Sequence, residues 1–190
     1  MRIIIITQNE PFYLAENIRY LFDLLPPNIT VVGVVLYEPS PFGKKKSFWN
    51  KALSTIKIFG INFFLFYALQ FLKIKLGNKP TIKSFLRRNK INIINLKNSI
   101  NNRESLKIIE SYKPDLLVSI LGNEIFKKDL LKIAPLGCIN LHSSLLPKYR
   151  GLLPTFWILK NKEKLSGVSV FFVDEGIDSG QIIIQKKFSV

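Results

Sequence analysis

The opening segment constrains the fold more than any other stretch of the chain. Met1 to Thr7 is almost continuously apolar, which is typical of a central parallel strand buried on both faces. Asn9-Glu10-Pro11 predicts the start of a helix that runs to about Leu25, and Thr30 to Leu36 predicts a second buried strand. A strand, a helix and a strand in this order favour a right-handed crossover. We therefore expect an α/β protein with an open, doubly wound, mostly parallel sheet.

The rest of the chain continues this alternation. A length of 190 residues favours a single domain, which we expect to span residues 1–190. Further strands are predicted at 91–95, 116–121, 167–173 and 181–187, with another beginning at Gly137, and helices at 103–112 and 152–160. The lone cysteine, Cys138, excludes an intramolecular disulfide framework and a cysteine-cluster zinc site, and we expect it to be a small core residue.

The stretch from Gly137 to Gly151 changes character along its length. It begins as an apolar run that predicts a buried strand, and Pro147 and Gly151 later predict a turn. Asn140 and His142 are two residues apart, so on a strand they point to the same face. Leu141 points the opposite way, where we expect a core contact. The strand would therefore direct an amide and an imidazole at one place.

His142 is the only histidine of the chain. Imidazole is the side chain that most readily exchanges a proton near neutral pH, although a lone histidine is often only a hydrogen-bonded structural residue. A second polar stretch follows downstream, where Gly176 and Gly180 flank Asp178 between two apolar runs. A carboxylate on such a tight loop can fix the tautomer of an imidazole. Spacing alone leaves Asp174 and Glu175 open as alternatives to Asp178.

Together the two stretches carry a family resemblance. The chain resembles the formyltransferases that use 10-formyltetrahydrofolate in two segments. The first is Asn-Leu-His-Ser-Ser-Leu-Leu-Pro-Lys-Tyr-Arg-Gly, and the second, downstream, is Asp-Glu-Gly-Ile-Asp-Ser-Gly-Gln-Ile. The resemblance covers roughly Asp115 to Ile184. It implies a Rossmann-like formyltransferase domain, a formyl transfer to a primary amine without a metal, and a catalytic set of Asn140, His142 and Asp178.

The resemblance also implies a place for the folate donor. Gly122 to Phe126 follow a predicted strand, at the edge of an α/β sheet where ligands collect. The family's pterin ring lies there, and our candidates for donor binding are Leu121, Asn123, Ile125 and Asp174. Family members continue with at least one more helix beyond the position of Val190, so we expect the C-terminal part of the family domain to be missing.

Charge is distributed very unevenly. Residues 39–103 hold fourteen Lys and Arg and no Asp or Glu, and because the chain has 28 basic and 13 acidic residues, the remainder holds only 14 and 13. Nearly all of the net charge of +15 therefore lies in one insertion-like segment. A local positive field of this kind attracts anionic partners.

This basic insertion is also apolar at its centre. Phe48 to Leu76 predicts one long or broken helical stretch, and the apolar run from Ile58 to Leu72 is shorter than the roughly 20 residues that span a bilayer. The stretch would either contact an anionic membrane peripherally, through residues 44–90, or pack on the domain as an ordinary helical hairpin. Because the N-terminal apolar run is too short for a signal peptide, we expect a cytoplasmic protein.

The formyl acceptor is less constrained than the donor. A nucleotide-linked amino sugar suits a single short domain and explains a positive rim, and it is our first expectation. Methionyl-tRNA is the alternative, because a basic surface binds phosphates. A second alternative is a non-catalytic membrane- or nucleic-acid-binding module on a formyltransferase-like scaffold.

Overall fold

The computed structural model describes residues 1–39, 47–77 and 81–190. Within these limits the chain forms two compact units. Unit 1 contains residues 1–8, 26–36 and 91–190, and unit 2 contains residues 9–25 and 37–90. The lysine triplet Lys44-Lys45-Lys46 and Lys79 lie outside the described residues.

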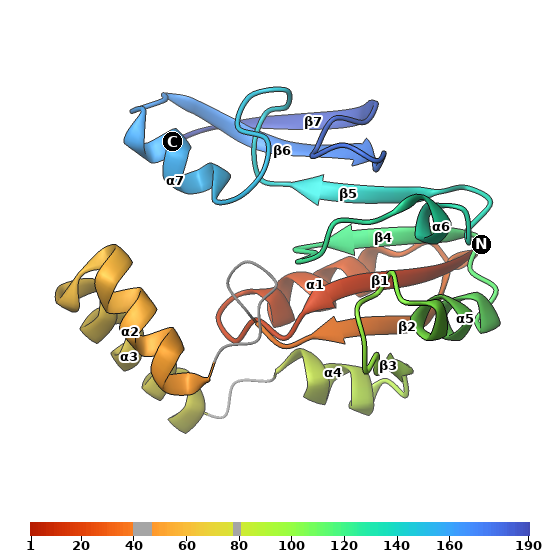
Figure 1. Ribbon diagram of the computed structural model, residues 1–190, viewed down its shortest axis with the longest axis horizontal. Coiled ribbons are helices and arrows are strands. Elements are labelled where there is room, and N and C mark those ends of the chain that lie inside the picture. Colours follow the sequence, from red (N-terminus) through yellow and green to blue (C-terminus); the bar gives the residue numbers. More distant parts are fainter. Residues whose placement is uncertain (40–46, 78–80) are drawn as a thin grey trace. The chain divides into compact units, whose positions relative to one another are not determined.

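Unit 1 is built on a seven-stranded sheet with the order β3-β2-β1-β4-β5-β6-β7 (Figure 1). β1 pairs with β4, β4 with β5 and β2 with β3 in parallel, whereas β5–β6 and β6–β7 are antiparallel. The predicted mostly parallel α/β sheet is confirmed. The strands are β1 (Arg2–Gln8), β2 (Thr30–Tyr37), β3 (Ile93–Ile94), β4 (Leu116–Ile120), β5 (Cys138–His142), β6 (Leu165–Phe172) and β7 (Ile182–Ser189).

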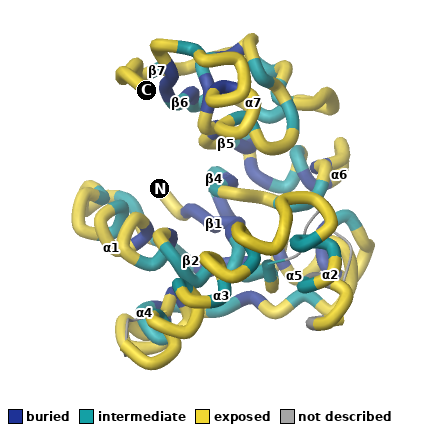
Figure 2. The backbone as a smooth tube through the Cα atoms, turned by 90° about the vertical axis from the view of Figure 1, so that its left-hand side faces the viewer, coloured by how far each residue is buried: buried dark blue, intermediate teal, exposed yellow. Residues whose placement is uncertain are grey.

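The centre of the sheet forms the core of unit 1. Ile3 to Ile6 on β1 are at most 3% exposed, and Figure 2 shows β1 largely in the colour of buried residues. Continuous apolar strands suit this position, because a central parallel strand has no solvent-facing side. The helices of this unit are α5 (Arg103–Ser111), α6 (Lys128–Leu131) and α7 (Pro154–Lys160).

Unit 2 is helical, with α1 (Leu14–Leu24), α2 (Phe48–Phe59), α3 (Ile61–Leu76) and α4 (Ile82–Arg88). The predicted stretch from Phe48 to Leu76 is broken at Gly60, whose φ of +83° favours glycine. Side chains cap two of the helices: the Ser47 hydroxyl accepts from the backbone N–H of Asn50, and the Thr81 hydroxyl accepts from that of Ser84.

Three local predictions need correction. The first helix begins at Leu14 rather than near Asn9, because the Glu10 carboxylate accepts from the backbone N–H groups of Phe12, Tyr13 and Leu14. The strand predicted at 91–95 shortens to two residues, Ile93–Ile94. Leu141 is 40% exposed, because it lies one residue from the carboxyl end of β5.

Cys138 is a core residue, as predicted, at 2% exposure. Burial raises the pKa of its thiol to about 12, so almost no thiolate exists at pH 8. We expect the native protein to react with a thiol reagent such as DTNB about 10³-fold more slowly at pH 8 than the urea-unfolded chain, roughly the ratio of thiolate fractions. Equal rates at pH 8 would contradict this burial.

Candidate active site

The end of β5 presents the first two candidate residues. β5 lies between β4 and β6, with Asn140 opposite Ser119 on one side and Phe171 on the other. Asn140 and His142 share one face of the strand, as their spacing predicts. The Asn140 side chain is half-buried and has no hydrogen bond to any part of the chain that the structure describes. Its amide is therefore available to a ligand.

His142 is 7% exposed and has an oxygen near each ring nitrogen. Its Nε2 lies 2.8 Å from the carbonyl oxygen of Tyr149, which can only accept, so Nε2 is the protonated nitrogen of this contact. Its Nδ1 lies 3.5 Å from Oδ2 of Asp178. This second distance exceeds the roughly 2.7–2.9 Å of a charge-assisted hydrogen bond, so the contact is mainly electrostatic. A doubly protonated ring can use both oxygens.

Asp178 reaches His142 from the loop between β6 and β7. Its φ of +48° places it in the left-handed region, and its Oδ2 accepts from the backbone N–H of Gly151 at 2.7 Å. The same oxygen thus joins the loop after β5 to the imidazole. Gly151 has a φ of +85°, which matches the turn predicted there. Of the three acidic residues of this loop, the structure brings Asp178 to the imidazole.

Asp174 has a different role within the same loop. Its Oδ1 accepts from the backbone N–H of Gly176 at 3.0 Å and from the Ser179 hydroxyl at 2.7 Å. Glu175 is exposed. The carboxylate of Asp174 therefore shapes the loop that carries Asp178.

Tyr149 is a site residue that the sequence analysis missed. It supplies a backbone carbonyl, which has no residue-type signature, and its φ of +58° turns that carbonyl toward His142. The position of Tyr149 is fixed through its side chain, because its hydroxyl donates to Glu163 at 2.7 Å and accepts from the Asn161 amide at 3.0 Å. These polar contacts of Tyr149 indicate a rigid support for the imidazole.

Two buried serines make hydrogen bonds that stabilise the loop after β5. The Ser144 hydroxyl donates to the carbonyl of Lys148 at 2.8 Å. The Ser169 hydroxyl donates to the Ser144 carbonyl at 2.6 Å and accepts from the Gln185 amide at 2.8 Å. Ser144 is fully buried, so its hydroxyl serves the loop rather than an incoming carbonyl group.

The candidates for donor binding lie after β4. Leu121 and Ile125 are 48% and 62% exposed and offer apolar surface, and the Leu121 carbonyl accepts from the Gln8 amide at 2.6 Å. The Oδ1 atom of Asn123 is buried and has no hydrogen-bond partner among the residues that the structure describes, and the same is true of the hydroxyl of Thr7 on β1. Because β1 and β4 are paired neighbours, both orphaned atoms lie toward the same edge of the sheet. Unsatisfied buried polar atoms at such an edge indicate a polar ligand.

The described part of the chain contains no group of three or more His, Cys, Asp and Glu residues that would suit a metal ion. Among the same residues we find no helix with the length and hydropathy needed to cross a bilayer.

Comparison with known proteins places these residues in a wider group. The family model described as formyl transferase matches residues 72–190, which include the site residues described above apart from Thr7 and Gln8. A protein of Clostridioides difficile (strain 630) named methionyl-tRNA formyltransferase is 37% identical over 170 residues, covering 90% of this chain and 45% of the relative. One of the same name from Thermodesulfovibrio yellowstonii is 45% identical over 85 residues, covering 45% of this chain and 28% of the relative. The chain thus spans less than half the length of these relatives.

Solved structures share the fold. The phosphoribosylglycinamide formyltransferase of Bacillus halodurans matches with a TM-score of 0.64 at 18% identity, covering 100% of this chain and 80% of that one. At this identity the likeness concerns the fold alone.

Proposed function

The chain belongs to the formyl transferase family, and from this premise we propose that it transfers a formyl group from 10-formyltetrahydrofolate to a primary amine. The observation that carries the proposal is the convergence of Asn140, His142 and Asp178 from two separate segments. The proposed product pair is the N-formylated amine and tetrahydrofolate.

The proposed donor site lies along the segment after β4. The pterin ring of the donor is a flat heterocycle with hydrogen-bonding edges, and the unpaired Oδ1 of Asn123 would accept a hydrogen bond from such an edge. Leu121 and Ile125 would contact the ring through their exposed apolar side chains. Asp174 would act through the loop that it shapes. When bound, the donor supplies the activated formyl carbon.

The proposed mechanism uses the three polar side chains in distinct roles. The acceptor amine attacks the formyl carbon, a carbon–nitrogen bond forms, and negative charge develops on the formyl oxygen. The Asn140 amide would stabilise this charge as a donor fixed in advance. A protonated His142 would add its positive charge, while its two ring nitrogens face the Tyr149 carbonyl and Asp178. Asp178 would hold His142 in its orientation and stabilise its protonated form.

The same residues account for the proton balance. The bond from the formyl carbon to the donor nitrogen then breaks, and that nitrogen takes up a proton equivalent to the one lost by the amine. His142, which contacts Asp178, would pass this proton.

For the acceptor we propose an aminoacyl-tRNA of the methionyl type rather than an amino sugar. The relatives reported above are named methionyl-tRNA formyltransferases, and the expected nucleotide-linked amino sugar has no support in the comparisons. The excess of basic residues suits a polyanionic acceptor. This acceptor implies a cytoplasmic location, where charged tRNA is available.

A transfer assay with competing acceptors tests this function. We expect tetrahydrofolate release with methionyl-tRNA and none with uncharged tRNA, and we expect kcat/KM to fall at least tenfold between roughly 50 and 200 mM salt, because bound phosphates release counterions. Turnover with an amino-sugar nucleotide alone would overturn the acceptor but keep the chemistry. Donor binding without turnover on either acceptor, or no donor binding at all, would overturn the proposed enzyme and favour a non-catalytic module.

A further inference from the structure

Helix α3 is apolar around its whole circumference and yet has no buried residue. All of its residues except Asn62, Gln70, Lys73 and Lys75 are apolar. A helix of this composition is normally buried in a core or a membrane. Its most exposed large side chains, each at least 50% exposed, are Ile61, Leu65, Phe66, Leu69, Leu72 and Leu76.

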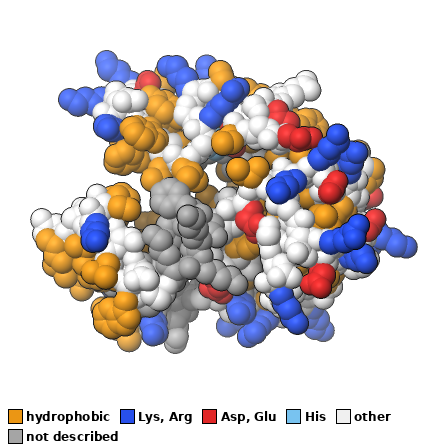
Figure 3. All heavy atoms as spheres, viewed as in Figure 1, with side chains coloured by type: hydrophobic (Ala, Val, Ile, Leu, Met, Phe, Trp, Pro, Cys, Tyr) orange, Lys and Arg blue, Asp and Glu red, His pale blue; other side chains and the backbone are white. Residues whose placement is uncertain are grey.

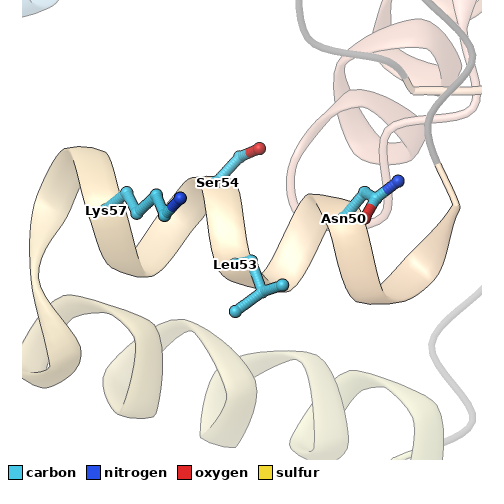
Figure 4. A pocket seen from close by; sticks show the side chains of 4 residues that line it. All are labelled: Asn50, Leu53, Ser54 and Lys57. Carbon is cyan, nitrogen blue, oxygen red and sulfur yellow. The ribbon is translucent and has the colours of Figure 1, made fainter.

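Helix α2 also exposes apolar side chains, and it carries polar side chains on another side. Leu53 and Ile58 are 55% and 62% exposed. In Figure 4, Leu53 points toward the neighbouring helix, whereas Asn50 and Ser54 point away from it. These residues and Lys57 line a surface recess of about 330 Å³. The Asn50 amide and the Lys57 ammonium are donors that suit a phosphate group.

The two helices carry only positive charge. Lys57 lies in the last turn of α2, Lys73 and Lys75 lie in the last turn of α3, and neither helix contains Asp or Glu. Figure 3 shows hydrophobic side chains gathered over α2 and α3, with basic side chains beside them. An exposed apolar surface edged by lysines is complementary to a layer that is apolar inside and anionic outside.

The geometry of the helix pair suits a shallow position in such a layer. Gly60 turns the chain between α2 and α3, and the 16 residues of α3 make a helix about 24 Å long, too short to span a bilayer unaided. Along one side of α3, the rings of Phe63 and Tyr67 stack at 6.1 Å, and Tyr67 contacts Phe12 at 4.8 Å. The ring contact with Phe12 ties α3 to the segment before α1.

We propose that α2 and α3 dock the protein peripherally on an anionic phospholipid bilayer. In this arrangement α3 lies in the interface, and the lysines and the polar side of α2 face the lipid phosphates. A second copy of the chain fits less well, because its α2 and α3 would bring the same positive charge. Nucleic acid offers phosphates but no apolar layer for α3. This inference is independent of the proposed transfer reaction.

Vesicle binding of the full chain tests the docking surface. We expect binding to phosphatidylcholine vesicles that contain about one quarter phosphatidylglycerol, and much weaker binding to pure phosphatidylcholine. Replacing Lys73 and Lys75 together with glutamine should lower the partition coefficient roughly 30-fold, at the usual contribution of a lysine near an anionic surface. The matched control, Lys127→Gln with Lys128→Gln at the start of α6, should leave binding unchanged.

A second pair of variants tests the apolar contact. Phe66→Glu on α3 should lower partitioning at least tenfold, because it places a charge in the apolar layer. Tyr20→Glu on α1 is matched in exposure, at 64% against 60%, and should bind as the unchanged protein does. Absence of binding to anionic vesicles, or an equal loss with Tyr20→Glu, would overturn the proposal. So would self-association that is lost in Phe66→Glu while vesicle binding persists.

Discussion

His142→Ala is expected to lower kcat for formyl transfer by roughly 10²–10⁴-fold, the usual contribution of a positioned acid–base group. His142 is the only imidazole of the chain, so no second histidine can replace it. Its ring lies between the Tyr149 carbonyl and the Asp178 carboxylate, and both hold it in one orientation. Added imidazole should restore part of the lost kcat, which a purely structural role would not allow. The measurement is tetrahydrofolate release under saturating donor and acceptor.

Ser144→Ala is the matched control for His142→Ala. Ser144 is buried in the same loop, and its hydroxyl also approaches the Tyr149 carbonyl, at 3.4 Å. Losing this hydroxyl should lower the free energy of unfolding by about 0.5–1.5 kcal/mol while kcat falls less than tenfold. If Ser144→Ala and His142→Ala reduced kcat equally, the effect would come from the loop and not from proton transfer.

The sequence predicted those parts of the site that follow from strand geometry. The spacing of Asn140 and His142 placed both side chains on one face, and the buried run before them predicted the strand that carries them. The proximity of Asp178 followed from the family resemblance, since spacing alone left Asp174 and Glu175 equally suitable. In the structure the difference between these residues is the fold of the loop, in which Gly176 and Ser179 hold Asp174 away from the imidazole.

Other features depend on contacts that residue types do not reveal. The Tyr149 carbonyl contributes through its backbone, so any residue with the same φ could supply it. The first helix starts late because the Glu10 side chain satisfies three backbone donors before regular hydrogen bonding begins. For α3, composition predicted a helix correctly but left its surroundings open, because an apolar helix is equally suited to a protein core and a lipid surface.

Asp178 makes two contacts through the same oxygen atom, and a pair of substitutions separates them. Asp178→Asn keeps an oxygen that can accept from the Gly151 N–H but removes the charge facing His142. We expect it to lower kcat about 10²-fold with little change in stability. Asp178→Ala removes both contacts, so it should show the same loss of kcat and lower the free energy of unfolding by a further 1–3 kcal/mol or so, because the Gly151 N–H loses its partner. Activity assays and urea denaturation measure the two effects.

Glu175→Gln distinguishes the effect of the direct Asp178–His142 contact from the effect of the total negative charge of the loop. It removes one negative charge from the same loop, but Glu175 is exposed, and Asp178 is the loop residue in contact with His142. Exposed charges act weakly across solvent at physiological salt, so Glu175→Gln should change kcat less than threefold or so. A loss as large as that of Asp178→Asn would mean that the imidazole responds to the total charge of the loop. A small loss, together with the stability difference between Asp178→Asn and Asp178→Ala, would assign one oxygen atom both tasks: closing the loop at Gly151 and orienting the imidazole.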